Sequence, residues 1–455
     1  MRENKILTGS IPQQLLLFFA PIWLGTLFQQ LYNTVDTLIV GNFVGTEALA
    51  AVGAAGAFVQ LLVGFFTGLC GGAGVIIAQS WGAGDREMVD RQVHTGLVLS
   101  VAGGLVMTLF GMAVSRPVLV LMHTPADIVA DAALYMRVFF LGMAPQMLYN
   151  MGTNILRAVG DSKRPVYFLV LASLVNIVLD LLFVAVLGWG VAGAAAATVI
   201  SQVVSAVLTL RCLAGSDGMP WHLQADKMRM EQPVLYGICR IGLPAAVQSS
   251  LYSVSNLAIQ AAINGFGTAA VAAWSVYGKI DFFFWMTVFA MGNSLVTFAG
   301  QNFGAQQYDR VWQGTWWCLG ITAALTAGIS VTFFAAAEPL FRLFSQDEAV
   351  VAQGVQMMHF LVPAYMTYIG IEVFASVLRG CGDVKVPTLI TVFGVCVLRM
   401  VWVLALVPLH PTVTMVEASY PITWTAASLL FFFYFIKGGW LRRCIAARQA
   451  SRQEA

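Results

Sequence analysis

The sequence predicts an all-α integral membrane protein. Twelve transmembrane helices are expected in two parallel six-helix halves, related by a pseudo-two-fold axis along the membrane normal. Three observations predict this fold: an apolar composition, a succession of long apolar segments, and an internal repeat.

The composition indicates that most of the surface faces lipid. Of 455 residues, 59% are hydrophobic and only 10% are charged, whereas a soluble domain carries about 25% charged residues. The net charge of +2 gives no indication of nucleic-acid binding. The seven cysteines are scattered, without a CxxC pair or a Cys/His cluster, which argues against a zinc site, an iron–sulfur site or a disulfide framework. No cofactor is expected, and no cleavable signal peptide is evident.

Hydropathy divides the chain into segments long enough to cross a bilayer, which takes about 20 apolar residues. The expected spans are 12–41, 48–80, 92–114, 127–156, 165–187, 191–212, 235–263, 268–301, 312–336, 351–378, 387–408 and 416–437. The longest polar break suggests the domain division. We expect an N-terminal lobe at 1–213, a cytoplasmic linker at 214–233, a C-terminal lobe at 234–440 and a cytoplasmic tail at 441–455.

The distribution of Lys and Arg predicts the orientation. If the N-terminus is inside, the outward-facing turns hold only Arg116 and Arg342, and the other basic residues outside the spans face inward. Such an asymmetry favours cytoplasmic loops rich in Lys and Arg. It predicts a multi-pass protein of the cell (inner) membrane with both termini in the cytoplasm and an even number of spans.

An internal repeat relates the two halves. The segment Leu156–Pro165 matches Leu378–Pro387 at six of ten positions, at an offset of 222 residues. Pro21 and Pro244 are related by nearly the same offset. Because both six-span halves start inside, the repeat is parallel, which is a common construction in transporters.

Two carboxylates lie in the apolar segments of the first half. Asn176 and Asp180 are four residues apart and therefore share a helix face, while Asp36 lies in the first span. A charged group inside the bilayer costs on the order of 3 kcal/mol and usually marks an ion or proton path. By residue count, Thr198 lies at a similar depth to the two acids.

These four side chains are the expected coupling site. Together they form an all-oxygen set that suits a hard monovalent cation such as sodium. Two carboxylates held close together in a dry site can also carry a proton, so the sequence does not choose between the two ions. The structural alternative is an interhelical hydrogen bond that holds the bundle together.

The first span carries further polar residues on the face of its acid. Gln29 and Asn33 follow helical spacing toward Asp36 and are candidates for lining a cavity. Pro21 lacks a backbone N–H, so a kink is expected there. A kinked helix that carries an acid is a candidate moving part.

The second half lacks the acids at the equivalent positions, so ion coupling is expected in the first half alone. It has its own intramembrane charges, and we expect them to be satisfied by each other or by neighbours: Lys279, Asp281, Glu372 and Arg399. This half is also rich in Met and aromatic residues, which are more often core than substrate-binding.

The repeated Leu-Arg-x-x-Gly-Asp-x-Lys turns, Pro21 with Asp36, and the Asn176-x-x-x-Asp180 pair with Thr198 are similar to features of a known family. The chain resembles the multidrug and toxic-compound extrusion (MATE) family, closer to the DNA-damage-inducible-type branch. The resemblance implies antiport, in which inward sodium or proton flow drives export of amphipathic, often cationic, organic compounds. It places the protein among membrane lipids, and twelve spans suffice for a monomer.

The sequence bears on three other functional classes. A flippase for a lipid-linked oligosaccharide or cell-wall precursor can share this architecture, but such proteins usually line the cavity with several basic residues, and few buried cations occur here. A membrane enzyme is not expected, because no nucleophile–base pair, metal cluster or phosphate loop stands out. A channel is the third alternative, and ion currents far above the turnover of a transporter would identify it.

Overall fold

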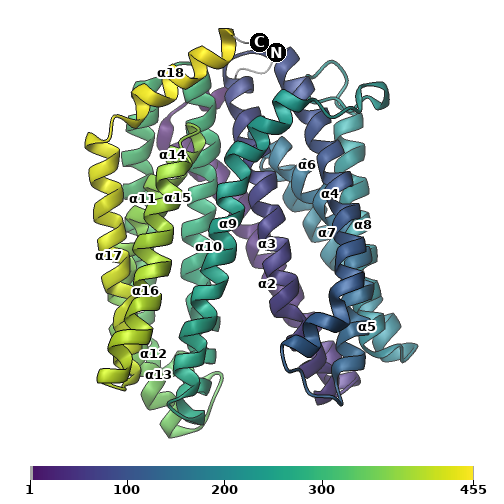
Figure 1. The fold of residues 1–455 in the computed structure, drawn as a ribbon, viewed down its shortest axis with the longest axis vertical. Helices are drawn as coiled ribbons and strands as arrows, with labels where there is room; N and C mark the ends of the chain where they lie inside the picture. Colours follow the sequence, from purple (N-terminus) through teal and green to yellow (C-terminus); the bar gives the residue numbers. More distant parts are fainter. Residues whose placement is uncertain (1–3, 454–455) are drawn as a thin grey trace. The chain divides into compact units, whose positions relative to one another are not determined.

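The computed structural model describes residues 4–453, and within them every regular element is a helix (Figure 1). The predicted fold class is confirmed. Residues 1–3 and 454–455, which belong to the predicted N-terminal lobe and tail, lie outside the described residues.

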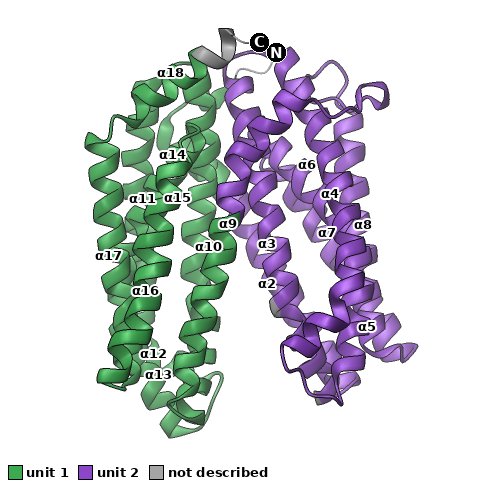
Figure 2. Cartoon of the chain, viewed as in Figure 1, with its two compact units in different colours: residues 1–19, 247–455 green, residues 20–246 purple. Residues whose placement is uncertain are grey.

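The chain divides into two compact units, which are described separately (Figure 2). Unit 2 is Ala20–Ala246, and unit 1 comprises the residues up to Phe19 and those from Val247 onward. Both boundaries fall inside helices. Helix α2 (Ile11–Phe43) begins in unit 1 and continues in unit 2, whereas α9 (Gln232–Asn264) begins in unit 2 and continues in unit 1.

This division differs from the sequence-based division at the polar linker, and packing explains the difference. The first turns of α2 place Ile11 and Leu15 in the core of unit 1. The first turns of α9 place Val234 and Ile238 in a core cluster of unit 2. Each helix therefore starts in the core of one unit and changes unit close to its proline, Pro21 or Pro244.

Unit 2 holds the middle part of the chain. Besides its parts of α2 and α9, its elements are α3 (Thr46–Gly82), α4 (Arg86–Leu121), α5 (Val129–Leu141), α6 (Met143–Ala158), α7 (Lys163–Asp180), the π-helix η1 (Leu181–Val186), α8 (Gly190–Ala214) and the 3₁₀ turn η2 (Ala225–Lys227). Its apolar side chains form two core clusters, one around α5 and one around the start of α9.

Unit 1 holds the remaining helices around one large core cluster. Its elements are α1 (Lys5–Thr8), α10 (Thr268–Gly304), α11 (Tyr308–Ala335), α12 (Ala337–Arg342), α13 (Glu348–Leu361), η3 (Val362–Ala364), α14 (Tyr365–Gly380), α15 (Lys385–Thr391), η4 (Val392–Val397), α16 (Leu398–Val401), η5 (Trp402–Leu406), η6 (Val407–Leu409), α17 (Val413–Lys437) and α18 (Trp440–Gln453).

Eleven helical segments among the described residues are long and apolar enough to cross a membrane. The remaining predicted span, 127–156, is divided into α5 and α6 at Gly142. A Cβ atom at Gly142 would lie 2.1 Å from Oε1 of Gln202, so glycine permits a close approach of α8 at this break. The equivalent position in unit 1 is the 3₁₀ turn η3, which contains Pro363 and separates α13 from α14. The shared interruption supports the duplication.

Glycines also let α3 and α9 cross closely within unit 2. A Cβ atom at Gly72 would lie 2.6 Å from the backbone nitrogen of Gly242, and one at Gly68 would lie 2.7 Å from that of Ala246. Real Cβ atoms cannot approach so closely, so the crossing requires glycine at these positions. This contact holds the first half of α9 in unit 2.

The two ends of the described chain lie at the same end of unit 1. Arg310 donates hydrogen bonds to the carbonyl oxygens of Ile6 within α1 (3.1 Å) and of Gly9 between α1 and α2 (2.8 Å). Arg448 of α18 donates to the carbonyl oxygens of Phe303 (2.7 Å) and Gly304 (2.9 Å), where α10 ends. Termini on one side agree with an even number of crossings; their cytoplasmic location stays a prediction.

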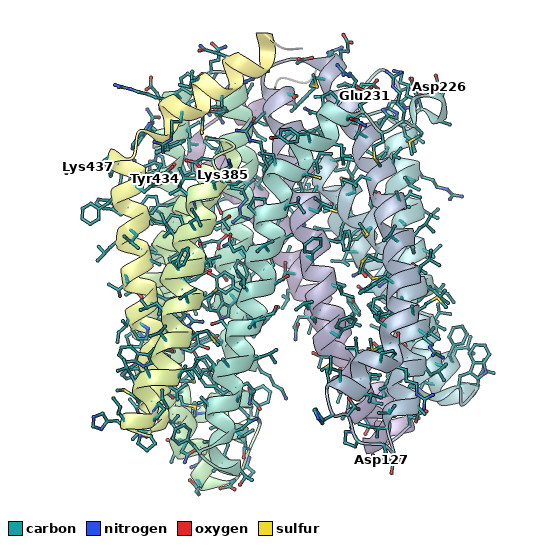
Figure 3. All side chains as sticks on the ribbon, in the orientation of Figure 1. Asp127, Asp226, Glu231, Lys385, Tyr434 and Lys437 are labelled. Atoms are coloured by element: carbon teal, nitrogen blue, oxygen red, sulfur yellow. The ribbon has the colours of Figure 1, made fainter. Side chains whose placement is uncertain are left out.

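The predicted linker is held against α4 in unit 2. Glu231 accepts hydrogen bonds from Arg91 of α4 and from Arg229 (3.0 Å). Burial by itself raises the pKa of Glu231, but the two arginines outweigh it and hold this pKa below its usual value. Figure 3 shows Glu231 with Asp226 at one end of unit 2, and Asp127 at the opposite end. Charged groups therefore gather at the two ends of this unit, as expected for a bundle that crosses a bilayer.

Candidate functional site

All four residues of the predicted coupling site lie in unit 2. Asp36 is carried by α2, Asn176 and Asp180 by α7, and Thr198 by α8. Asp180 is fully buried and Asn176 is 1% exposed. Asp180 ends α7 and is followed directly by the π-helical turn η1, a wider coil that often occurs at functional sites. The helical spacing of four places both buried side chains of α7 on one face.

The structure brings the two acids together. The Asp36 and Asp180 carboxyl groups lie within hydrogen-bonding reach and interact electrostatically. Yet Asp36 Oδ1 and both oxygens of Asp180 are buried and make no hydrogen bond within the described chain. Buried carboxylates normally have partners. A pair without them has the chemistry to bind a positive ion, either a metal cation or a proton.

Asn176 and Thr198 have different surroundings. Both polar atoms of the Asn176 side chain are buried without a hydrogen-bond partner in the described residues. The Thr198 hydroxyl donates to the carbonyl oxygen of Ala194 in its own helix (3.1 Å), which leaves its oxygen available as an acceptor. Thr198 is half-buried and makes no hydrogen bond to either acid in the part of the chain described. The acids and Asn176 are therefore the better-defined part of the site.

The three cavity or hinge candidates all lie on α2. Pro21 immediately follows the point where this helix passes from unit 1 to unit 2. Gln29 is exposed, and its side chain lies within hydrogen-bonding reach of Tyr32. Asn33 is also exposed. Their proposed roles in lining a cavity or bending the helix stay predictions.

Two tyrosines near the acids were missed by the sequence reasoning. Tyr32 of α2 and Tyr135 of α5 both interact electrostatically with Asp36 and Asp180. Tyr32 precedes Asp36 by four residues, so helical spacing could have identified it. Tyr135 could not be found in this way, because its proximity depends on how α5 packs. Their hydroxyls can donate hydrogen bonds to a carboxylate or accept one from a protonated acid.

The intramembrane charges of the second half contact neighbours rather than each other, and two of them are only partly satisfied. Asp281 accepts a hydrogen bond from Trp285 and Arg399 donates one to Thr423, but Asp281 Oδ1 and Arg399 Nε are buried without a partner among the described residues. Glu372 accepts hydrogen bonds from Ser376 (3.2 Å) and Tyr368 (3.5 Å). The Lys279 ammonium lies 5.5 Å from the centre of the Phe344 ring. Among the described residues, no group of three or more His, Cys, Asp or Glu could hold a metal ion.

The MatE family model matches residues 21–182 and 244–404, which together make up more than half of the chain. The chain belongs to the MATE family. Each match begins at or next to one of the two helix prolines, Pro21 and Pro244, so the two matched segments are the two halves of the repeat. The prediction of a transporter, and not an enzyme, is confirmed.

Relatives and solved structures agree with this assignment. The chain is 27% identical to the probable multidrug resistance protein YoeA of Bacillus subtilis, covering 94% of each chain. It is 25% identical to the FAD transporter of Shewanella oneidensis, over 76% of this chain and 77% of that protein. A MOP superfamily transporter from Pyrococcus furiosus shares the fold, with a TM-score of 0.89 at 23% identity and 98% coverage of both chains.

These similarities establish a multi-pass membrane transporter of the MATE family that handles small organic substrates and ions. They favour drug or toxic-compound export over the flippase alternative. The assignment to the DNA-damage-inducible-type branch stays a prediction, as does the identity of the coupling ion.

Proposed function

We propose that this MATE transporter is a secondary antiporter that exports amphipathic, often cationic, organic compounds in exchange for inward sodium or proton flow. The observation that carries the proposal is the meeting of Asp36 and Asp180, whose buried oxygens have no hydrogen-bond partner among the described residues. A charged pair in this state is unfavourable, so an ion that neutralises it is strongly held.

In this proposal the acids hold the coupling ion, and Asn176 and Thr198 supply neutral oxygens beside them. Binding of the ion removes the repulsion between two carboxylates, which at about 4 Å and an effective dielectric constant near 20 amounts to about 4 kcal/mol. That free energy difference is large enough to shift a two-state equilibrium strongly.

Helix α2 is the proposed link between ion binding and the change of conformation. It carries Asp36 and Tyr32 in unit 2, while its first turns are packed into the core of unit 1. Pro21 removes one helical hydrogen bond near the passage between units, so bending there is less costly than elsewhere in the helix. Binding or release of the coupling ion at Asp36 would shift the equilibrium between a straight and a bent α2. Gln29 and Asn33 would line the cavity surface next to Asp36.

The test is transport in proteoliposomes containing the purified full-length protein. Sodium and pH gradients are imposed separately, and efflux of a panel of cationic dyes is followed. One gradient, or both, should drive efflux by the wild type, and Asp36→Asn and Asp180→Asn should each reduce it to the level of empty vesicles. Asp131→Asn, an exposed acid on α5, is the matched control. Gradient-driven efflux that survives in both site variants would overturn the assignment.

The same preparation tests the remaining expectations. We propose that a monomer in the lipid bilayer of the cell (inner) membrane is the functional unit. Single-particle counting of labelled chains in vesicles should therefore find transport at one chain per vesicle. Activity confined to vesicles with two or more chains would contradict this.

A further inference from the structure

A cluster of basic side chains, called the basic cluster below, lies at the end of unit 1 that carries α18. It consists of Lys385 at the start of α15, Lys437 at the end of α17, and Arg442 and Arg443 on α18. All four side chains are exposed. Figure 3 shows Lys385 and Lys437 toward this end of unit 1. The coupling site gives these side chains no role.

Two hydrogen bonds join the three elements that carry the cluster. The Arg443 Nη2 of α18 donates to the hydroxyl oxygen of Tyr434 on α17 (2.6 Å). That hydroxyl in turn donates to Oδ2 of Asp383, which lies two residues before Lys385 and the start of α15. Lys437 follows Tyr434 by three residues, so it lies on a neighbouring part of the same helix surface. The four cations therefore belong to one surface.

Helix α18 is fixed on unit 1 through one face, which leaves its two arginines of the cluster on the exposed face. Trp440 is 1% exposed, and its indole Nε1 donates to the carbonyl oxygen of Phe435 (2.9 Å). Leu441, Cys444 and Ile445 pack against the core of unit 1. These positions repeat at helical spacing and form one face of the helix. Since α18 buries its apolar face on the protein itself, only its polar face is free to meet a ligand.

Acidic groups of the chain balance little of this charge. No ion pair within 4 Å joins any member of the basic cluster to a carboxylate in residues 4–453. Asp383 meets Arg443 only through the Tyr434 hydroxyl. In unit 2, by contrast, the basic residues of the linker are paired with acids. The cluster in unit 1 therefore suits an anion from outside the chain.

The other half of the repeat lacks this cluster, so a general excess of basic residues at one membrane face does not explain it. At the 222-residue offset, three of its members correspond to uncharged residues: Lys437 to Gly215, Arg442 to Pro220 and Arg443 to Trp221. Only Lys385 has a basic counterpart, Lys163 at the start of α7.

The helices that carry the cluster continue into an exposed apolar surface. Phe433 and Ile436 of α17 are 55% and 42% exposed, and Leu389 of α15 and Phe393 of η4 are 53% and 61% exposed. At 1.5 Å per residue, all four lie within about 12 Å of the helix ends that bear the lysines. Both segments are long and apolar enough to cross a membrane, and α15 packs against α17. A charged rim next to such a surface matches a phospholipid, which joins a charged head group to apolar chains.

We propose that the basic cluster binds the head group of an anionic phospholipid, whose acyl chains lie against the exposed apolar surface of α15, η4 and α17. Arginine can donate two parallel hydrogen bonds to a phosphate, and lysine acts as a point charge. Basic residues that directly follow a membrane span attract anionic lipids. A free phosphate would meet the same cations but would gain nothing from the apolar surface. The proposal does not rest on the antiport.

The test is lipid binding to the purified full-length protein in detergent, measured by native mass spectrometry. Phosphatidylglycerol is compared with phosphatidylcholine that carries the same acyl chains. The wild type should bind phosphatidylglycerol at least about 30-fold more tightly, because each cation near the head group contributes about a fivefold gain in affinity. The double variant Lys437→Gln/Arg443→Gln should lose about 10- to 30-fold of that affinity.

Two matched controls separate loss of charge from other effects. Lys163→Gln removes the exposed counterpart of Lys385 in unit 2 and should leave phosphatidylglycerol binding unchanged. Lys437→Arg/Arg443→Lys keeps both charges and should keep the binding, so that a loss in the glutamine variant cannot be assigned to substitution at these positions as such.

Two further measurements identify the source and the place of the ligand. Excess inorganic phosphate should not displace phosphatidylglycerol. A phosphatidylglycerol with a photoactivatable head group should label peptides from α18 and from the start of α15. Equal affinity for the two lipids, wild-type binding by the glutamine variant, displacement by inorganic phosphate, or labelling confined to other helices would each overturn the proposal.

Discussion

Replacing Asn176 by leucine separates a binding site from a structural contact. The Asn176 side chain is 1% exposed, and both of its polar atoms are buried without a partner among the described residues. A buried polar group that lacks a partner costs about 1–3 kcal/mol. Leucine has the same number of side-chain heavy atoms, branched in the same way, and it is larger and has no polar atoms. Asn176→Leu is therefore expected to raise the free energy of unfolding by up to about 3 kcal/mol in the absence of added cation.

The same substitution should weaken ion binding. If the Asn176 oxygen faces a cation, its loss removes an interaction with a charged group worth about 1.5–3 kcal/mol, which corresponds to about a 10- to 150-fold loss in apparent ion affinity. A higher free energy of unfolding together with weaker ion coupling in Asn176→Leu would indicate that the Asn176 side chain serves ion binding. If Asn176 instead made an interhelical hydrogen bond that holds the bundle, Asn176→Leu would lower the free energy of unfolding.

The assay combines chemical unfolding in detergent with ion-driven dye efflux at varied ion concentration. Ser173→Ala is the control, because Ser173 is buried on the same helix and donates to the carbonyl oxygen of Leu169 (2.8 Å). It should change stability by at most about 1.5 kcal/mol and leave the ion dependence unaltered. If Asn176→Leu destabilises the protein and keeps the wild-type ion dependence, Asn176 is not part of an ion-binding site.

Three further predictions follow from the structure. Asp36→Asn and Asp180→Asn should abolish gradient-driven efflux while each variant still binds dye, as measured by fluorescence polarisation; loss of dye binding instead would indicate a folding defect. Gly72→Ala should lower the free energy of unfolding by about 1–3 kcal/mol, because the added Cβ overpacks the α3–α9 crossing. The control Gly53→Ala, where a Cβ meets nothing within 4 Å, should instead stabilise α3 by about 0.5–1 kcal/mol. Equal melting temperatures of the two variants would contradict the crossing geometry. The pKa of Glu231 is lower in the folded protein than its ordinary value of 4.5. The stabilising effect of the ionised Glu231 is therefore fully present above pH 4.5 and is lost as the pH falls through the pKa of the folded protein. Protease cleavage of the linker should increase on acidification below pH 4.5 in the wild type, and it should not depend on pH in that range in Glu231→Gln.

The sequence was sufficient to predict the fold class because the signals that predict it can be read without knowing how the helices pack. These signals are the length of the apolar segments and the 222-residue repeat. The spacing of Asn176 and Asp180 likewise predicted a shared face, and the structure places both buried on α7. That Asp36 meets Asp180 was expected from their depth, which helical rise determines.

Features that depend on packing between distant segments could not be predicted in the same way. The early turns of α2 and α9 belong to different units from their later turns, because their apolar residues enter the cores of those units. Tyr135 is placed near the acids by the packing of α5. In unit 1, Tyr277 and Tyr365 are far apart in sequence, and only the structure shows that their hydroxyl oxygens lie 3.0 Å apart.

The most direct test of the central claim is equilibrium ion binding to the purified protein. Radioactive sodium binding and proton uptake at fixed pH are measured for the wild type and for the variants Asp36→Asn and Asp180→Asn. We expect the wild type to take up one of the two ions and to release it when a transported dye is added, and we expect both variants to lack that exchange. Ion uptake and dye-induced release at wild-type levels in either variant would contradict the account.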